Sequence, residues 1–293
     1  MARRCPWPDG TSSGPAASKT LIQHFAGRYA AESAQGRTPS GVAHDFDVLQ
    51  PSASLRPARL PERLDQKVPI LQLQVVEPWA EQRVKLETRF GLHAHDKPGA
   101  SLAEATLVVW AVKPQTFHDA ALQAGPHNPN ALHLSVAAGI RSDSIAGWLG
   151  TERVVRAMPN TPALIDQGVT ALFARSGVTA ADRRVIDQLV QTTGSHLWLD
   201  AEAQLDAVTA LSGSGPAYVF YVIEAMVQAG VEMGQSPQQA HQLAVGTFAG
   251  AAALAQGSEE APATLRARVT SKGGTTHAAR QRARELGDEF GAG

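Results

Sequence analysis

The 293-residue chain has 26 Lys and Arg against 27 Asp and Glu, so its formal charge of −1 gives no reason to expect a nucleic acid or an anionic membrane as a partner. The single cysteine, Cys5, excludes an intrachain disulfide and a cysteine-built zinc site; it fits a reducing compartment such as the cytoplasm, and we predict no metal. No apolar run reaches the ~18 residues that a membrane span needs, and the length suffices for two domains.

Residues 1–66 differ from the rest of the chain. Pro, Ser, Arg and Gly are scattered through them without a helical or strand period. We predict a disordered extension. A targeting segment is the alternative, because roughly the first thirty residues are poor in acidic side chains and carry several Arg and Ser, although their helical amphipathicity is weak.

From residue 67 the pattern becomes that of an α/β domain, which we extend to residue 199. Continuous apolar runs predict strands that are buried on both faces, and helical stretches such as 80–89 separate them. The expected strands cover residues 71–76, 106–112, 132–137 and 153–157. This alternation is typical of a doubly wound (Rossmann-like) parallel sheet, in which ligands bind beyond the carboxyl ends of the strands.

Residues 200–293 are predicted to be helical. Ser212-Gly-Ser-Gly-Pro216 forms a flexible entry to a helix that is apolar on all sides as far as about Gly234, and this pattern predicts a buried helix. Ser236-Pro-Gln-Gln239 has the spacing of a capping box and begins a further helix, 240–256, whose many Gly and Ala residues permit close helix contact.

Three motifs in these two regions occur together in one known family. They are Ala157-Met-Pro-Asn-Thr-Pro162, Ser212-Gly-Ser-Gly-Pro216 and Val269-Thr-Ser-Lys-Gly-Gly-Thr-Thr276. From Val68 to the C-terminus the chain resembles pyrroline-5-carboxylate reductase. The resemblance implies reduction of 1-pyrroline-5-carboxylate to L-proline, the last step of proline biosynthesis, with NADPH or NADH. It also implies a homodimer or higher homo-oligomer built on the helical domain.

The resemblance also implies cofactor-binding residues, which lie at the ends of the predicted strands. A turn after residues 106–112 and a second turn after residues 132–137 would contact the dinucleotide. Glu77 would meet the adenosine ribose, where a carboxylate bonds a 2′-hydroxyl and repels a 2′-phosphate and so indicates tolerance of NADH; the equal alternative is a solvated acid at a helix start. Asn160 would either face the cleft or bond locally. The residues implied are Glu77, Ala111, Val112, Lys113, Pro114, Val136, Ala137, Ala138 and Asn160.

The substrate is a small ring with an imine and a carboxylate, so its site needs hydrogen-bond donors that hold the carboxylate. Two Gly-rich segments and two acidic residues are implied: Ser212, Gly213, Ser214, Gly215, Glu202, Glu259, Gly274, Thr275 and Thr276. Thr276 is the expected catalytic residue, which would also bond the ring nitrogen. Viewed without the resemblance, Glu202 and Glu259 would be surface acids and His277 a junction residue.

The chain departs from the family at three places. No G-x-G-x-x-G loop occurs upstream of residue 71, and no glycine lies between Asp45 and Lys67, so the expected sheet is incomplete; we interpret residues 1–66 as an out-of-frame or wrongly started segment. Lys272 stands where the family often has Pro, and about twenty residues are missing before Arg280. The sequence thus predicts an impaired reductase. The alternative is an inactive remnant that only pairs with intact subunits. A dehydrogenase of the β-hydroxyacid type is disfavoured, because no lysine follows Lys272.

Overall fold

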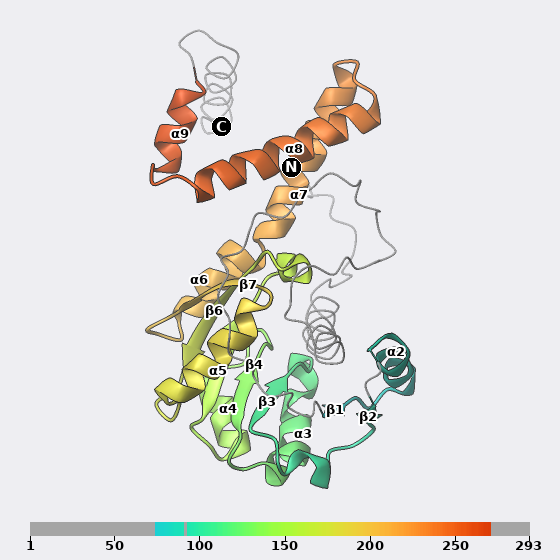
Figure 1. The fold of residues 1–293 in the computed structure, drawn as a ribbon, viewed down its shortest axis with the longest axis vertical. Coiled ribbons are helices and arrows are strands. Elements are labelled where there is room, and N and C mark those ends of the chain that lie inside the picture. The colour runs from blue at the N-terminus through green and yellow to red at the C-terminus, as the bar shows by residue number, and fades with distance from the viewer. Residues whose placement is uncertain (1–73, 91–92, 271–293) are drawn as a thin grey trace, which may run out of the picture. The chain divides into compact units, whose positions relative to one another are not determined.

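The computed structural model describes residues 74–90 and 93–270 (Figure 1). They form two compact units, one ending at Pro216 and the other beginning at Ala217. The first is an α/β unit and the second is helical, which confirms the predicted fold class. The domain boundary expected at residue 199 stays a prediction, and the expected extension, residues 1–66, lies outside the described residues. No helix in the described ranges is long and apolar enough to cross a membrane.

The α/β unit begins with a small parallel sheet of two strands, β1 (Val75–Val76) and β2 (Ala94–His95), joined by helix α2 (Ala80–Phe90). Val76 packs against the core that surrounds Trp110. Within residues 74–90 and 93–270, no strand links this pair to the larger sheet. The strands of the described residues thus belong to two separate sheets. The predicted lack of a strand upstream of residue 71 concerns residues outside the described ranges and stays a prediction.

The larger sheet has five strands that follow each other in chain order. They are β3 (Leu107–Trp110), β4 (Leu132–Ser135), β5 (Val154–Met158), β6 (Gly168–Ala174) and β7 (Gly194–Trp198). The first three are parallel and agree with the predicted strands. The sequence interpretation did not include β6 and β7. β6 runs antiparallel to β5, and β7 parallel to β6, so the sheet is mixed rather than purely parallel.

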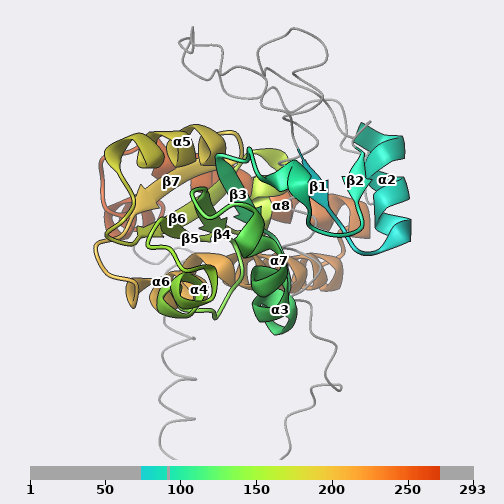
Figure 2. The same cartoon turned by 90° about the horizontal axis from the view of Figure 1, so that it is seen from below.

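Helices cover both faces of this sheet, with α5 on one side and α3 and α4 on the other (Figure 2). The side chains of β4 alternate between the two faces, so both faces need a cover. Leu132 and Leu134 pack with Ile186 of α5, whereas His133 contacts Trp110 on the other face. The helices are α3 (Pro114–Ala124), α4 (Ser142–Leu149) and α5 (Ala180–Gln191), with short 3₁₀ turns η1 (Ala100–Leu102), η2 (Gly125–His127) and η3 (Thr161–Ile165).

Two glycines allow β6 and β7 to start side by side. Gly168 and Gly194 are paired in the register of the two strands. Gly194 has φ +139°, and a Cβ there would lie 2.1 Å from the carbonyl oxygen of Gly168. A side chain at residue 194 would therefore meet both backbone strain and a backbone atom that cannot move aside.

Helices continue from the sheet into the second unit. They are α6 (Gln204–Val208), the π-helical turn η4 (Thr209–Gly213), α7 (Gly215–Glu232), α8 (Pro237–Gln256) and α9 (Pro262–Arg268). The predicted capping box at Ser236 is confirmed: its Oγ accepts the Gln239 amide at 3.2 Å, and the Gln239 Oε1 accepts the Ser236 amide at 3.0 Å. One close helix contact is present, where Gly230 of α7 lies against Ala240 of α8, but the space beside Gly246 and Gly250 of α8 is open among the described residues, so close contact at these two glycines stays a prediction.

The prediction that the helix after Pro216 is buried is wrong for the single chain. Among the residues of α7 only Gly230 is buried, and Phe220 and Tyr221 are 64% and 72% exposed. One chain has too few helices here to enclose an apolar surface on every side. An all-round apolar pattern indicates burial against something, and it does not say whether that neighbour belongs to the same chain.

Candidate functional site

Two turns lie side by side where β3 and β4 end. Trp110 and Ser135 are paired in the register of the two strands, and the Val136 amide donates to the Trp110 carbonyl at 3.2 Å. The turn that begins at Ala111 and the turn that begins at Val136 therefore start at the same edge of the sheet. In a doubly wound sheet, this edge of the parallel strands is where ligands bind.

The first turn, Ala111 to Pro114, leads directly into α3. Lys113 is the N-cap residue, with extended backbone angles of φ −63° and ψ 144°, and its side chain makes no capping bond. Its carbonyl accepts both the amide of Thr116, at 3.0 Å, and the Thr116 hydroxyl, at 3.2 Å. Pro114 fits the first helical position because that residue needs no amide hydrogen. The backbone of the turn is thus fixed by local contacts.

The second turn presents only small groups. Val136 and Ala137 are buried, and the Ala137 amide donates to the Ser135 hydroxyl at 3.3 Å. Ala138 is exposed, and Gly139, also exposed, has φ +78°, a conformation that favours glycine. A flat ligand could approach this backbone closely, because no large side chain projects from residues 138 and 139.

Trp110 and His133 form a buried aromatic pair on β3 and β4, the strands that lead into the two turns. The Trp110 indole N–H donates to His133 Nδ1 at 3.0 Å, and the Trp110 ring lies 5.1 Å from the Phe117 ring. Burial, followed by the charge of Arg153, lowers the pKa of His133 to about 4. His133 is therefore neutral at pH 7, with its proton on Nε2. Sequence reasoning missed this pair, although an indole at one strand end and an imidazole on the next strand are a visible signal.

Glu77 directly follows β1, as expected, and the side chain of Arg83 hydrogen-bonds to the backbone at this point. Oε1 of Glu77 accepts the amide of Trp79 at 3.1 Å. Arg83, half-buried on α2, donates from Nη1 to the carbonyls of Glu77 and Pro78, both at 2.8 Å. Sequence reasoning missed Arg83. The signal was its place in the first turns of the following helix, because helical side chains lean toward the N-terminus and so toward the strand end.

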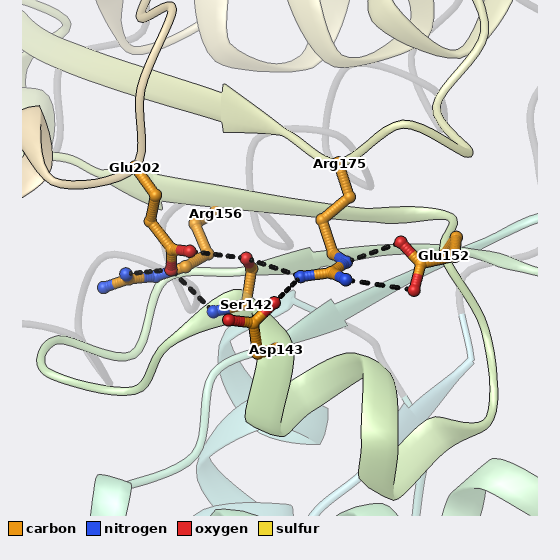
Figure 3. A network of polar contacts seen from close by, with 6 residues as sticks. All are labelled: Ser142, Asp143, Glu152, Arg156, Arg175 and Glu202. Carbon is orange, nitrogen blue, oxygen red and sulfur yellow. Dashed lines mark hydrogen bonds and ion pairs between the residues drawn. The ribbon is translucent and has the colours of Figure 1, made fainter.

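Glu202, an expected substrate residue, instead holds together parts of the α/β unit (Figure 3). Its Oε1 accepts the Ser142 amide and Nη1 of Arg156, each at 2.6 Å, and its Oε2 accepts the Ser142 hydroxyl at 2.6 Å. Burial alone would raise the pKa of Glu202, but the hydrogen bonds from Ser142 and Arg156 outweigh it and hold the pKa below its usual value. A contact of Glu202 with substrate stays a prediction, although all its observed partners are structural.

The same network continues to Arg175 through the Ser142 hydroxyl, which accepts Nη1 of Arg175 at 3.1 Å (Figure 3). Arg175 also pairs with Asp143 and, through Nε at 2.8 Å, with Glu152. An open hollow of about 300 Å³ lies beside these three charged residues. Because two carboxylates already neutralise Arg175, this hollow lacks the free charge that an anionic cofactor requires.

The expected substrate loop packs against the expected motif at the end of β5. Ser212 and Gly213 lie in the π-helical turn, and the Ser212 hydroxyl donates to the Val208 carbonyl at 3.2 Å. A Cβ on Gly213 would lie 2.7 Å from Cε of Met158, which is the second residue of the Ala157–Pro162 motif. Single π-turns inside helices are rare and occur often at functional sites. The structure thus brings two of the three motifs into contact.

The remaining expected residues are less informative. Asn160 bonds locally, its Oδ1 accepting the Val169 amide at 2.9 Å, and its contact with a cofactor stays a prediction. Glu259 is exposed and belongs to the second unit. Gly274, Thr275 and Thr276 lie outside the described residues, as do Lys272 and His277. In the described ranges, no three His, Cys, Asp or Glu side chains are placed to hold a metal.

Comparison with known proteins identifies the family. Residues 202–288 match the pyrroline-5-carboxylate reductase dimerisation domain. A pyrroline-5-carboxylate reductase of Pseudomonas aeruginosa is 46% identical over 216 residues, which cover 73% of this chain and 79% of that protein. The chain belongs to the pyrroline-5-carboxylate reductase family. Sequence interpretation and comparison agree on this point, and the family places the chain among the oxidoreductases.

Solved structures of pyrroline-5-carboxylate reductases share the fold. The enzyme of Coxiella burnetii matches with a TM-score of 0.67 and 31% identity, covering 74% of this chain and 82% of that one. The Plasmodium falciparum enzyme, solved with NADP bound, matches with a TM-score of 0.61 and 26% identity over 68% of this chain and 76% of that one. The family thus includes a member with a nicotinamide dinucleotide bound.

Proposed function

We propose that this chain reduces 1-pyrroline-5-carboxylate to L-proline with a reduced nicotinamide dinucleotide, NADPH or NADH, in the cytoplasm. The observation that carries the proposal is the 46% identity to a pyrroline-5-carboxylate reductase over 216 residues. The single cysteine supports the cytoplasmic assignment, because it fits a reducing compartment. The proposed pathway step is the last one of proline biosynthesis.

The described residues fit a nicotinamide dinucleotide. The turns after β3 and β4 start side by side, and exposed Ala138 and Gly139 leave room for a flat ring to approach. Ala111 to Pro114 would border the cofactor on one side, and Glu77 would lie at the ribose. When bound, the cofactor supplies the hydride.

The substrate would be held by its carboxylate. In the proposed site, the amides of Gly274 and Thr275 and the hydroxyl of Thr276 donate to the carboxylate, and the Ser212–Gly215 loop borders the pocket. The ring nitrogen takes up a proton, and the hydride adds to the imine carbon, which gives the secondary amine of proline. Thr276 would orient the ring nitrogen by a hydrogen bond, with water as the proton source.

The second unit is proposed to bind a second copy of the chain. Its long helices expose many large apolar side chains, and a soluble monomer rarely exposes so many in one region. Those of α7 and α8 are Tyr218, Val219, Phe220, Tyr221, Val222, Met226, Val231, Leu243, Val245 and Leu254. The match of residues 202–288 to a dimerisation domain supports a homodimer or a larger homo-oligomer.

The decisive experiment measures oxidation of NADPH and of NADH by the purified 293-residue chain, with and without 1-pyrroline-5-carboxylate. We expect imine-dependent turnover that is slower than the roughly 1–100 per second of ordinary enzymes, because the sequence lacks the Gly-rich loop that would hold the pyrophosphate. Thr276→Ala should lower kcat/KM by roughly 100-fold, since general acid–base and positioning residues contribute that much. Thr275→Ala is the matched control, because its expected contact is through the backbone amide. A folded wild-type chain without imine-dependent oxidation would contradict the proposed activity.

One observation favours a second candidate function. The sequence has no G-x-G-x-x-G loop upstream of residue 71, so the cofactor site would be incomplete, while the dimerisation domain is matched over residues 202–288. The chain would then serve only as a partner of intact subunits. Gel filtration of the chain mixed with a full-length relative distinguishes the two, because only the second candidate requires mixed oligomers.

A further inference from the structure

The side chain of Arg83 is anchored at the end of β1. Nη1 donates to the carbonyl oxygens of Glu77 and Pro78, both at 2.8 Å, and the side chain is half-buried. Because helical side chains lean toward the N-terminus, an arginine at this position of α2 reaches back to the strand that precedes the helix. The guanidinium is therefore held in place before any ligand binds.

The rest of the guanidinium has donors to spare. Arginine has five N–H groups in a planar fork, and the two anchoring bonds use only those of Nη1. Over residues 74–90 and 93–270, neither Nε nor Nη2 of Arg83 makes a hydrogen bond or an ion pair. Among the described residues the Glu77 carboxylate forms no ion pair with Arg83, and its observed bond is to the Trp79 amide at 3.1 Å. An anchored cation with donors to spare is suited to an anion.

The position of the Arg83 guanidinium indicates which anion it would bind. Under the proposed function, Glu77 after β1 lies at the adenosine ribose. In dinucleotide-binding domains an acidic residue at the ribose bonds the 2′-hydroxyl of NADH, and an arginine nearby accommodates the 2′-phosphate of NADPH. This chain has both side chains near that place, Glu77 directly after the strand and Arg83 on the helix. The carboxylate alone would favour NADH, so the arginine changes the expected preference.

We infer that Arg83 binds the 2′-phosphate of NADPH, while Glu77 accepts a hydrogen bond from the ribose. The inference rests on the proposed function and deepens it, because it assigns the choice between the two cofactors to one residue. The fork geometry of the guanidinium matches phosphate oxygens, and hydrogen bonds between two charged groups are stronger than neutral ones. The chain therefore accepts NADPH in spite of the carboxylate at Glu77.

Calorimetric titration of the full chain with two adenosine nucleotides tests the inference without any turnover. Adenosine 2′,5′-bisphosphate and 5′-AMP differ only in the 2′-phosphate. We expect Arg83→Gln to weaken binding of the bisphosphate roughly 10- to 100-fold, the loss of a charged hydrogen-bonded pair, and to change binding of 5′-AMP less than about twofold. Arg83→Lys, which keeps the charge and loses the fork, should lie between Arg83→Gln and the wild type.

Lys85→Gln is the matched control. It removes one positive charge from the same helix, and residues two apart do not share a helix face, so binding of both nucleotides should remain as in the wild type. Equal weakening of the bisphosphate by Lys85→Gln and Arg83→Gln, or equal loss of both nucleotides in Arg83→Gln, would overturn the role of Arg83 alone. A folded wild-type chain that binds neither nucleotide would overturn the proposed cofactor site, and the inference with it.

Discussion

Single residues whose partners are distant in the sequence hold the α/β unit together. Glu202 lies 60 residues from Ser142 and 46 from Arg156, yet it binds both. Glu202 and Arg156 are each little exposed, at 13% and 11% of their side-chain surface. A charged pair with this burial is costly to break, because the remaining charge then lacks both its partner and water.

Replacing Glu202 should therefore destabilise the fold. Glu202→Ala leaves Arg156 and two donors of Ser142 without an acceptor, and we expect the free energy of unfolding to fall by about 3 kcal/mol. Denaturant unfolding at pH 7 measures this change. Glu259→Ala removes an exposed acid and serves as the control, with an unchanged unfolding midpoint. The same midpoint in both variants would show that Glu202 is not a structural anchor.

His133 should make the stability depend on pH. Its pKa is about 4 in the folded chain and 6.5 without burial, so below pH 6.5 the unfolded chain takes up a proton that the folded chain does not. Stability is complete above pH 6.5 and falls as the pH drops toward 4, with a loss of about 2 kcal/mol at pH 5.

Denaturant unfolding at pH 7.5 and pH 5 checks this dependence. His133→Asn keeps an acceptor for the Trp110 indole and cannot titrate, so its loss of stability between the two pH values should be smaller by about 2 kcal/mol. Parallel losses in the wild type and in His133→Asn would assign the pH dependence to other groups.

Helices and strands show how far sequence patterns reach. Apolar runs predicted β3, β4 and β5, and the capping box predicted the start of α8, because each of these signals is local. β6 was missed together with its antiparallel direction, since the residue pattern of a strand does not record which way its neighbour runs. The burial of α7 was predicted wrongly for the single chain, because periodicity does not identify the neighbour. Glu202 and Arg83 could not be assigned from spacing, since their contacts exist only after the elements have packed.

The start of the β6–β7 pair should tolerate only glycine. Gly194→Ala would place a Cβ against the Gly168 carbonyl in a backbone conformation that alanine avoids, and we expect a loss of at least about 2 kcal/mol in unfolding free energy. Gly147→Ala in α4 is the control, because space is open there and alanine favours a helix; a gain of up to about 1 kcal/mol is expected. Equal stability of the two variants would contradict the tight pairing.

At the scale of the whole molecule, the exposed apolar helices imply that a single chain is not the functional particle. The α/β unit has cores on both faces of its sheet, whereas the second unit buries few of its large side chains. A second copy of the same chain is the simplest source of a matching apolar surface, because two-fold symmetric dimers use one patch twice.

A charge in that surface should therefore dissociate the oligomer. Phe220 is 64% exposed on α7, and Phe220→Asp would bury a carboxylate in a dimer interface, so sedimentation at micromolar concentration should show monomers. Val84→Asp is the control, since Val84 is similarly exposed, at 61%, and lies on α2 outside the dimerisation match. If Phe220→Asp keeps the wild-type sedimentation coefficient, α7 does not form the interface.

The strand sequence of the larger sheet has a consequence for synthesis on the ribosome. Because β3 to β7 lie in the sheet in the same succession as in the chain, each strand after β3 finds a neighbouring strand already synthesised when it emerges. No strand has to wait for a distant segment or slip between two others, so the loops to be closed are short and their entropy cost is small. We expect the five-stranded sheet to form while the helices of the second unit are still being translated.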